Sequence, residues 1–211
     1  MNNFKTQYAL WDEFLKRWPV SRLAKMTLDE YNKTGSTGSG GSFTYWLEYR
    51  LRKLGGIGGY DKEKFGVCWL GEGEKPRHAH WISSKNHTWR PEFGATAEGV
   101  CSELRSYIEH IASLAAEGKI EDIDALNPPF SEPVKWKIAF LYQNWQRPVI
   151  VNVFTRKPLA AFTGISTNQG MNQGMAALQT AALKQRPAGM GILEFGQEVW
   201  DAWQKKRDGG R

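Results

Sequence analysis

Hydrophobic residues recur with helical spacing at both ends of this chain and with a spacing of two in its middle. Near the amino terminus, aromatic and leucine side chains three and four residues apart predict a helix over 4–18, and Pro19 ends it because proline lacks a backbone N–H. A short second helix is expected over 21–31, with Thr27 and Glu30 as a capping-box pair for its last turn. The chain therefore begins as a group of helices.

A glycine- and serine-rich stretch interrupts these helices. Residues 34–42 read TGSTGSGGS, a composition typical of a flexible loop, either a natural surface loop or an engineered linker. A helix over 43–54 is expected next, with its leucines inward, and the GGIGG run at 55–59 ends it. Because glycine has no side chain, the backbone of this run can pass close to another part of the chain.

Strand patterns occupy the middle of the sequence. Residues 64–70 alternate between two faces, and residues 77–93 predict one or two further strands. A helix over 96–117 follows, and Gly118 closes it. Its buried stripe is expected to consist of Val100, Leu104, Ile108, Ile111 and Ala115.

The clearest hairpin pattern comes after this helix. Residues 136–142 alternate as one strand, residues 143–148 form the turn, and residues 149–154 form the return strand. The remaining helices are expected over 157–162, 171–184 and 191–205.

This order of elements predicts one α+β domain over 1–211, in which helices pack a small antiparallel sheet. Helices form its amino-terminal part (1–60), the sheet and the 96–117 helix its middle (64–154), and helices again its carboxy-terminal part (156–206).

The charge of the chain is unevenly distributed. The formal net charge is +6, but residues 96–125 carry seven acidic and two basic side chains, a balance of −5, so the rest carries +11. A basic surface with one acidic helix suits a polyanionic partner, although an ordinary basic protein has the same composition. The chain also holds ten tryptophans, and tryptophan beyond the needs of a core often serves recognition surfaces.

Nothing in the sequence predicts export or a membrane span. Charged residues interrupt the first 20 positions, and no apolar run approaches the roughly 18 residues that cross a bilayer. With only Cys68 and Cys101, both expected as packed thiols, the sequence favours a cytoplasmic setting.

Catalytic patterns are missing from the sequence. His78, His80 and His87 lie close together, but the cysteine pair, carboxylate or i+4 histidine of known metal sites does not accompany them. We expect no metal and no cofactor, with these histidines as exposed polar or phosphate-facing residues. A carboxylate followed two residues later by lysine occurs only at 117–119, where a helix ends, and neither a P-loop nor a G-x-S-x-G elbow is present. The chain is therefore not expected to be a self-contained enzyme.

Aromatic and basic residues alternate in two segments that are expected to lie on the surface. Such a mixture suits base stacking together with phosphate neutralisation, although a protein–protein hot spot or plain packing uses the same residues. The residues predicted to contact bases or grooves are Trp81, Trp89, Tyr142, Trp145 and Arg147, with Asn86, Gln143 and Asn144 as groups for the edge of a base. The residues predicted to contact the DNA backbone are Lys85, Arg90, Lys137 and Arg50.

Several segments in order resemble one family. YALWDEFLKRWP, MTLDEYNK, FTYWLEYRLRKLGGIGG and KFGVCW are similar to the amino-terminal region that precedes the ATPase of McrB-type AAA+ restriction proteins. WRPEFGATAEGVCSEL, KWKIAFLYQNWQRPVIVNVF and ILEFGQEVWDAW extend the resemblance over most of the chain. The family's Walker motif is absent here, and the glycine-serine stretch at 35–42 has no place in the family pattern.

This resemblance implies a role in antiviral defence. It predicts a DNA-binding specificity module of a modification-dependent, type IV-like restriction system. This module would read duplex DNA, either unmodified or with a methylated or otherwise modified base. An AAA+ ATPase and a nuclease subunit are the expected partners. The alternative is a protein-interaction adaptor that docks the ATPase or another defence component through the acidic 96–117 helix and the tryptophan-rich terminal helices. A metal-dependent nuclease with a scattered site is a third hypothesis.

Overall fold

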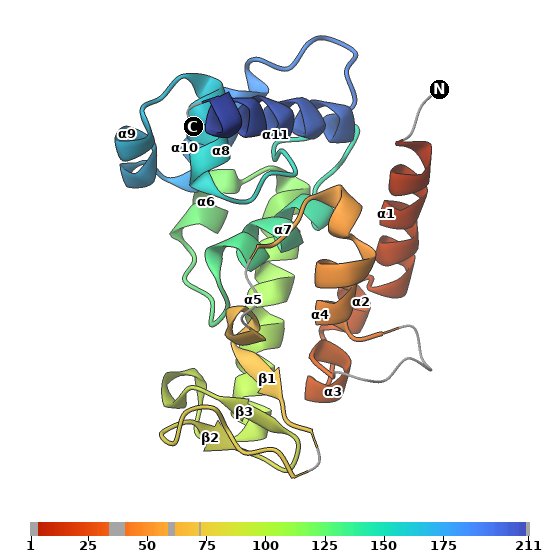
Figure 1. Ribbon diagram of the computed structural model, residues 1–211. Helices are drawn as coiled ribbons and strands as arrows, with labels where there is room; N and C mark the ends of the chain where they lie inside the picture. The colour runs from red at the N-terminus through yellow and green to blue at the C-terminus, as the bar shows by residue number, and fades with distance from the viewer. Residues whose placement is uncertain (1–3, 34–40, 59–61, 72, 210–211) are drawn as a thin grey trace.

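Helix α7 (Glu132–Tyr142) lies in the middle of the protein, and the other elements are arranged around it (Figure 1). The protein was analysed as a computed structural model, which describes residues 4–33, 41–58, 62–71 and 73–209. One hydrophobic cluster extends from Trp11 to Val199 and includes side chains from almost every element.

The chain is helical before the sheet and again after it. The first part consists of α1 (Lys5–Arg17), α2 (Val20–Leu23), α3 (Leu28–Tyr31), α4 (Phe43–Tyr45), the π-helical segment η2 (Trp46–Arg50) and the 3-10 helices η3 (Arg52–Leu54) and η4 (Lys62–Phe65). The sheet consists of β1 (Val67–Trp69), β2 (Ile82–Ser83) and β3 (His87–Trp89). The last part consists of η5 (Pro91–Phe93), α5 (Ala97–Glu117), α6 (Ile120–Ala125), α7, α8 (Arg156–Thr163), α9 (Thr167–Asn172), α10 (Met175–Leu183) and α11 (Ile192–Gly209).

The sheet is small and antiparallel. β3 is its central strand, with β1 and β2 on its two sides, and Trp89 pairs with Val67 on one side and with Ile82 on the other. The sheet lies at one end of the molecule, at the bottom of Figure 1. The α+β class and the strands expected over 64–70 and 77–93 are confirmed.

The helix predicted over 96–117 is confirmed as α5. The Thr96 hydroxyl accepts the Gly99 N–H at 3.1 Å, and Gly118 closes the helix with a φ of 76°. The whole predicted stripe is buried. The helices expected over 4–18, 157–162 and 191–205 are confirmed as α1, α8 and α11.

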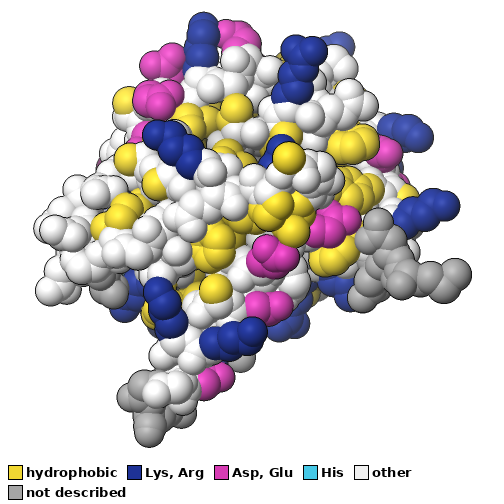
Figure 2. Space-filling view, turned by 90° about the horizontal axis from the view of Figure 1, so that it is seen from above, with side chains coloured by type: hydrophobic (Ala, Val, Ile, Leu, Met, Phe, Trp, Pro, Cys, Tyr) yellow, Lys and Arg dark blue, Asp and Glu magenta, His cyan; other side chains and the backbone are white. Residues whose placement is uncertain are grey.

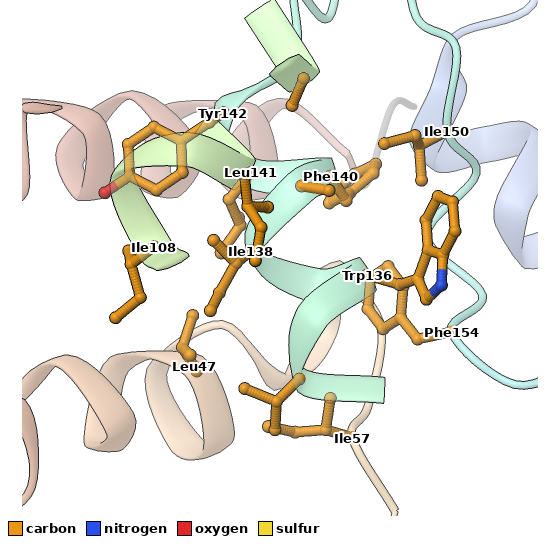
Figure 3. Packing of buried hydrophobic residues seen from close by; sticks show 14 of the residues in the cluster. Leu47, Ile57, Ile108, Trp136, Ile138, Phe140, Leu141, Tyr142, Ile150 and Phe154 are labelled. Carbon is orange, nitrogen blue, oxygen red and sulfur yellow. The ribbon is translucent and has the colours of Figure 1, made fainter. Parts of the chain in front are cut away.

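The hairpin predicted over 136–154 is wrong. Its first half is helix α7, in which every residue from Val134 to Tyr142 is buried. Figure 3 shows its side chains directed toward Ile108 of α5, Leu47 of η2 and Phe154. A helix that is buried on all sides has no polar face, so its apolar run has no helical period to distinguish it from a strand.

The second half of the expected hairpin is extended but pairs with no strand among the described residues. Gln143 accepts the N–H groups of Val149 and Ile150 at 2.9 and 2.8 Å, and its amide donates to the Ile150 carbonyl at 2.8 Å. Gln179 of α10 accepts the Val151 N–H at 2.7 Å and donates to the Val153 carbonyl at 2.9 Å. Two buried amide side chains thus replace a neighbouring strand and satisfy a backbone that water cannot reach.

Three expected helices are interrupted. The helix expected over 21–31 divides into α2 and α3, and the Thr27–Glu30 capping box begins α3 rather than supporting a last turn. The helix expected over 171–184 divides into α9 and α10, because the Asp124 carboxylate accepts the Ala176 N–H at 3.0 Å and caps α10.

The helix expected over 43–54 runs through α4, η2 and η3. Ser42 caps it by accepting the Tyr45 N–H at 3.3 Å. The loop predicted over 34–42 lies mainly outside the described residues.

Two further sequence expectations concern compartment. Within the described ranges, no helix combines the length and the apolar character that a membrane span requires. Both cysteines are free thiols, with Cys101 buried and Cys68 half-buried.

The close approach expected at the GGIGG run occurs at Gly55. Its φ is +102°, and a Cβ atom there would lie 2.4 Å from the Asn152 carbonyl oxygen. Only glycine fits both the backbone conformation and the space. Gly55 thus allows η3 to lie against the extended segment that the two glutamines hold.

Replacing Gly55 should destabilise the fold strongly. We expect Gly55→Ala to lower the free energy of unfolding by about 2 kcal/mol or more, because backbone strain adds to a clash with the Asn152 carbonyl. Gly56→Ala is the matched control, since no atom lies within 4 Å of a Cβ at Gly56. Urea denaturation of both variants measures the difference, and equal stabilities would contradict this account of Gly55.

Candidate nucleic-acid interface

The expected aromatic exterior is much smaller than the sequence indicates. Six of the ten tryptophans are buried, and only Trp145 and Trp200 are exposed, with 38% and 41% of their surface open. On the face seen in Figure 2, Lys and Arg side chains are dispersed among acidic and hydrophobic ones and do not gather into one patch. A candidate interface must therefore be local.

At the sheet, the predicted rings are buried and the predicted cations are exposed. The Trp89 indole N–H donates to the Gly94 carbonyl at 2.8 Å inside the core, and Trp81 is only 8% exposed. The Arg90 guanidinium lies 5.9 Å from the Trp81 ring centroid and covers it. Burial removes both indoles from direct contact with a base, whereas Lys85 and Arg90 remain open to solvent.

Two of the three histidines of this region bind other parts of the protein, whereas His80 is exposed as expected. His78 Nε2 lies 2.8 Å from a Glu63 carboxylate oxygen. His87 is buried, with Nε2 3.2 Å from the Asn32 carbonyl oxygen, so it does not face a phosphate as expected. Burial lowers the pKa of His87, and the nearby Asp29 opposes that shift. Within the described part of the chain, no three His, Cys, Asp or Glu side chains gather as metal ligands would.

Two lysines of α7 are structural. Lys137 is 0% exposed, and its Nζ donates to the carbonyls of Leu51 and Gly55 at 2.9 and 2.6 Å. Lys135 donates to the carbonyls of Asp124 and Leu126 at 3.0 and 2.8 Å. Lys135 thus binds two carbonyls at the carboxyl end of α6, and Lys137 joins the carbonyls on the two sides of η3. Lys137 therefore cannot reach a phosphate, and its predicted DNA contact is withdrawn.

The residues at the end of α7 divide between the core and the surface. The Tyr142 hydroxyl donates to the Trp18 carbonyl at 2.7 Å, and the Gln143 amide is used within the protein, so neither meets a base. The next four residues, 144–147, are all exposed. We call residues 143–148 the Trp145 turn.

The Trp145 turn is held in one shape. The Asn144 side-chain oxygen accepts the Gln146 N–H at 3.0 Å, and the Asn144 carbonyl accepts the Arg147 N–H at 3.0 Å. The Trp145 ring rests on Tyr8 of α1, with centroids 5.2 Å apart. The Tyr8 hydroxyl donates to Glu194 of α11 at 3.0 Å. A fixed indole and an arginine are therefore presented side by side.

The predicted residues do not form a single surface. The sheet carries Lys85 and Arg90 at one end of the molecule, whereas Trp145 packs against α1 toward the other end (Figure 1). Arg50 is exposed on η2, but it pairs with Glu13 at 3.0 Å and lies 4.7 Å from the Trp46 ring.

The structure also exposes an aromatic pair that the sequence prediction did not include. Tyr45 and Tyr49 are 43% and 61% exposed, and Arg52 and Lys53 follow them on the surface. We call these four residues the tyrosine ridge. In the helix expected over 43–54, the leucines face inward and these four residues lie on the other side, so the sequence already predicts an outward position for them.

Comparison of the chain with protein-family models, with curated proteins and with solved structures finds no match.

Removing Lys137 should change how stability depends on pH. Burial lowers the pKa of Lys137 to about 7, with Glu48 opposing and Lys64 adding to the shift. Below pH 7 both the folded and the unfolded chain hold the proton. Between pH 7 and the pKa of an unfolded lysine, about 10.4, the unfolded state holds more protons, so stability rises with pH by up to about 1.4 kcal/mol per unit. A neutral amine keeps two N–H donors for its two carbonyls.

The measurement is urea unfolding of the wild type and of Lys137→Met at pH 6, 7.5 and 9. The stability of the wild type relative to the variant should increase from pH 7.5 to pH 9. A constant difference would mean that Lys137 stays charged in the folded protein.

Proposed function

We propose that this chain is a DNA-binding specificity module of a modification-dependent restriction system, and that the Trp145 turn contacts duplex DNA. The observation that carries this proposal is the turn itself, a rigid loop that presents Trp145, Gln146 and Arg147 to solvent. Because hydrogen bonds and the Tyr8 ring already fix the turn, binding costs little additional ordering.

The exposed side chains of the turn suit groove reading. Arginine donates a bidentate pair of hydrogen bonds to guanine, and an amide such as that of Gln146 pairs with adenine. An indole at the tip of a loop can enter between bases or cover the face of one that leaves the stack. A modified base would be recognised at this indole.

Phosphate contacts come from other residues in this proposal. Lys85 and Arg90 are exposed cations at the sheet end, and Arg50 is exposed beside Glu13. In this proposal, as the resemblance to McrB-type amino-terminal regions implies, DNA cleavage and ATP hydrolysis belong to separate partners, a nuclease and an AAA+ ATPase.

A second candidate function is a protein-interaction adaptor. The outward side of α5 and α6 carries exposed carboxylates, including Glu98, Glu117, Glu121 and Asp122. Such a surface repels DNA and suits a basic protein partner, such as an ATPase subunit. Tight binding to a purified partner without DNA binding at low salt would favour this function.

DNA binding through the turn is testable with two substitutions. Trp145→Ala and Arg147→Ala should each weaken duplex binding by about 1–3 kcal/mol, roughly 5- to 150-fold, because each removes a base contact. Trp200→Ala is the matched control, since Trp200 is equally exposed but has Glu198 and Asp201 nearby in sequence.

Fluorescence anisotropy with unmodified and base-modified duplexes over a salt series measures these affinities. The wild-type affinity should fall steeply as salt increases, because counterions are released from the phosphates that are contacted. An affinity that does not change with salt, or that Trp145→Ala leaves intact, would reject the proposal.

A further inference from the structure

The tyrosine ridge lies on an unusual piece of helix. η2 is π-helical, and the Leu51 N–H closes it by donating to the Trp46 carbonyl five residues earlier, at 2.9 Å. Single π turns are rare and occur frequently at functional sites. This turn keeps Trp46 and Leu47 in the core while Tyr45 and Tyr49 remain outside.

The two rings of the ridge support one another. Their centroids are 5.4 Å apart, with 33° between the ring planes. The backbone of Gly41 lies directly against Tyr45, since a Cβ at Gly41 would be 2.3 Å from the Tyr45 Cδ1 atom. The backbone of Gly41 therefore supports the Tyr45 ring, and the Tyr45 ring packs against Tyr49.

This geometry determines how an aromatic ligand can bind. Two rings that sandwich a base must stand about 7 Å apart, twice a contact distance of about 3.5 Å. The tyrosine rings are too close for that, so they form a platform with its open side at Tyr49. A platform of this kind accepts one flat group from outside.

The charges beside the platform favour an anionic ligand. Arg52 and Lys53 follow Tyr49 by three and four residues, and both are exposed on the 3-10 helix η3 that comes directly after η2. In the described part of the chain, neither forms an ion pair with a carboxylate. The nearest acidic residues in the sequence and across the helix, Glu48 and Glu13, are paired with Lys64 and Arg50 instead.

We propose that the tyrosine ridge is a binding site for single-stranded nucleic acid, which stacks an unpaired base on Tyr49 and places its phosphates at Arg52 and Lys53. An aromatic face next to free cations is the common arrangement for single strands, whose bases expose their faces, whereas a duplex covers them by stacking. This inference rests on the proposed function in that it assumes a nucleic-acid ligand, but it uses a different surface.

The experiment measures the anisotropy of a labelled oligodeoxyuridylate, an oligouridylate of the same length and a hairpin duplex, with the full chain and its variants. Tyr49→Ala should weaken binding of one or both single strands by roughly 5- to 150-fold, the range reported for loss of one stacked base. Tyr49→Phe should retain binding, because it keeps the ring, and Trp200→Ala should have no effect. Arg52→Ala with Lys53→Ala should lower the slope of log affinity against log salt by about 0.7 for each lost phosphate contact.

The outcomes separate this inference from the proposed function. Duplex binding through Trp145 without single-strand binding, or single-strand binding that Tyr49→Ala leaves unchanged, would overturn the ridge inference alone. Single-strand binding that depends on Tyr49, without duplex binding, would support the ridge and overturn the proposed duplex function. A difference between the deoxyuridylate and uridylate arms, which share one base and differ only in the sugar, identifies DNA or RNA as the source of the strand.

Discussion

The fold depends on buried lysines that join helix ends to a central helix. Lys135 and Lys137 project from α7. Lys135 donates to the Asp124 and Leu126 carbonyls at the carboxyl end of α6, and Lys137 donates to the Leu51 and Gly55 carbonyls on the two sides of η3. Burying an amine costs free energy, and these hydrogen bonds offset the cost. The hydrogen bonds of Lys135 and Lys137 thus help to fix the positions of α6 and η3 against α7. They also explain why lysine is tolerated at positions that water does not reach.

The elements that could be predicted are those with a polar and an apolar face. α5 has one buried stripe, a Thr96 cap and a terminal Gly118, so its period and both ends can be read from the sequence. α7 lacks a polar face, and its lysines fall between aromatic residues in a way that imitates a strand. The extended segment after it has the composition of a strand, but Gln143 and Gln179 satisfy its backbone. Gln179 lies 28 residues from Val151 in the sequence, so its hydrogen bond to that residue depends on the tertiary fold and cannot be predicted from the local sequence pattern.

The same limit applies to the candidate site. Trp145 and Arg147 were predictable because a polar turn between two apolar segments reaches the surface. Trp89 and Tyr142 also have polar and basic residues near them in the sequence, yet both are buried. Their polar atoms donate to the Gly94 and Trp18 carbonyls inside the protein, and the sequence pattern does not predict these partners. The outward position of the tyrosine ridge follows from the leucine spacing, but exposed aromatic residues on the outer face of a helix carry no sequence signal that separates them from ordinary surface residues.

Both candidate surfaces are attached to α7. The Trp145 turn begins at the carboxyl end of this helix, and Gln143 fixes its base. The tyrosine ridge continues into η3, whose end is bound by Lys137. Because a helix packed on all sides cannot bend without opening the core, the separation of the two surfaces is set by the fold rather than by the ligand. Any ligand that touches both surfaces must therefore match this fixed separation.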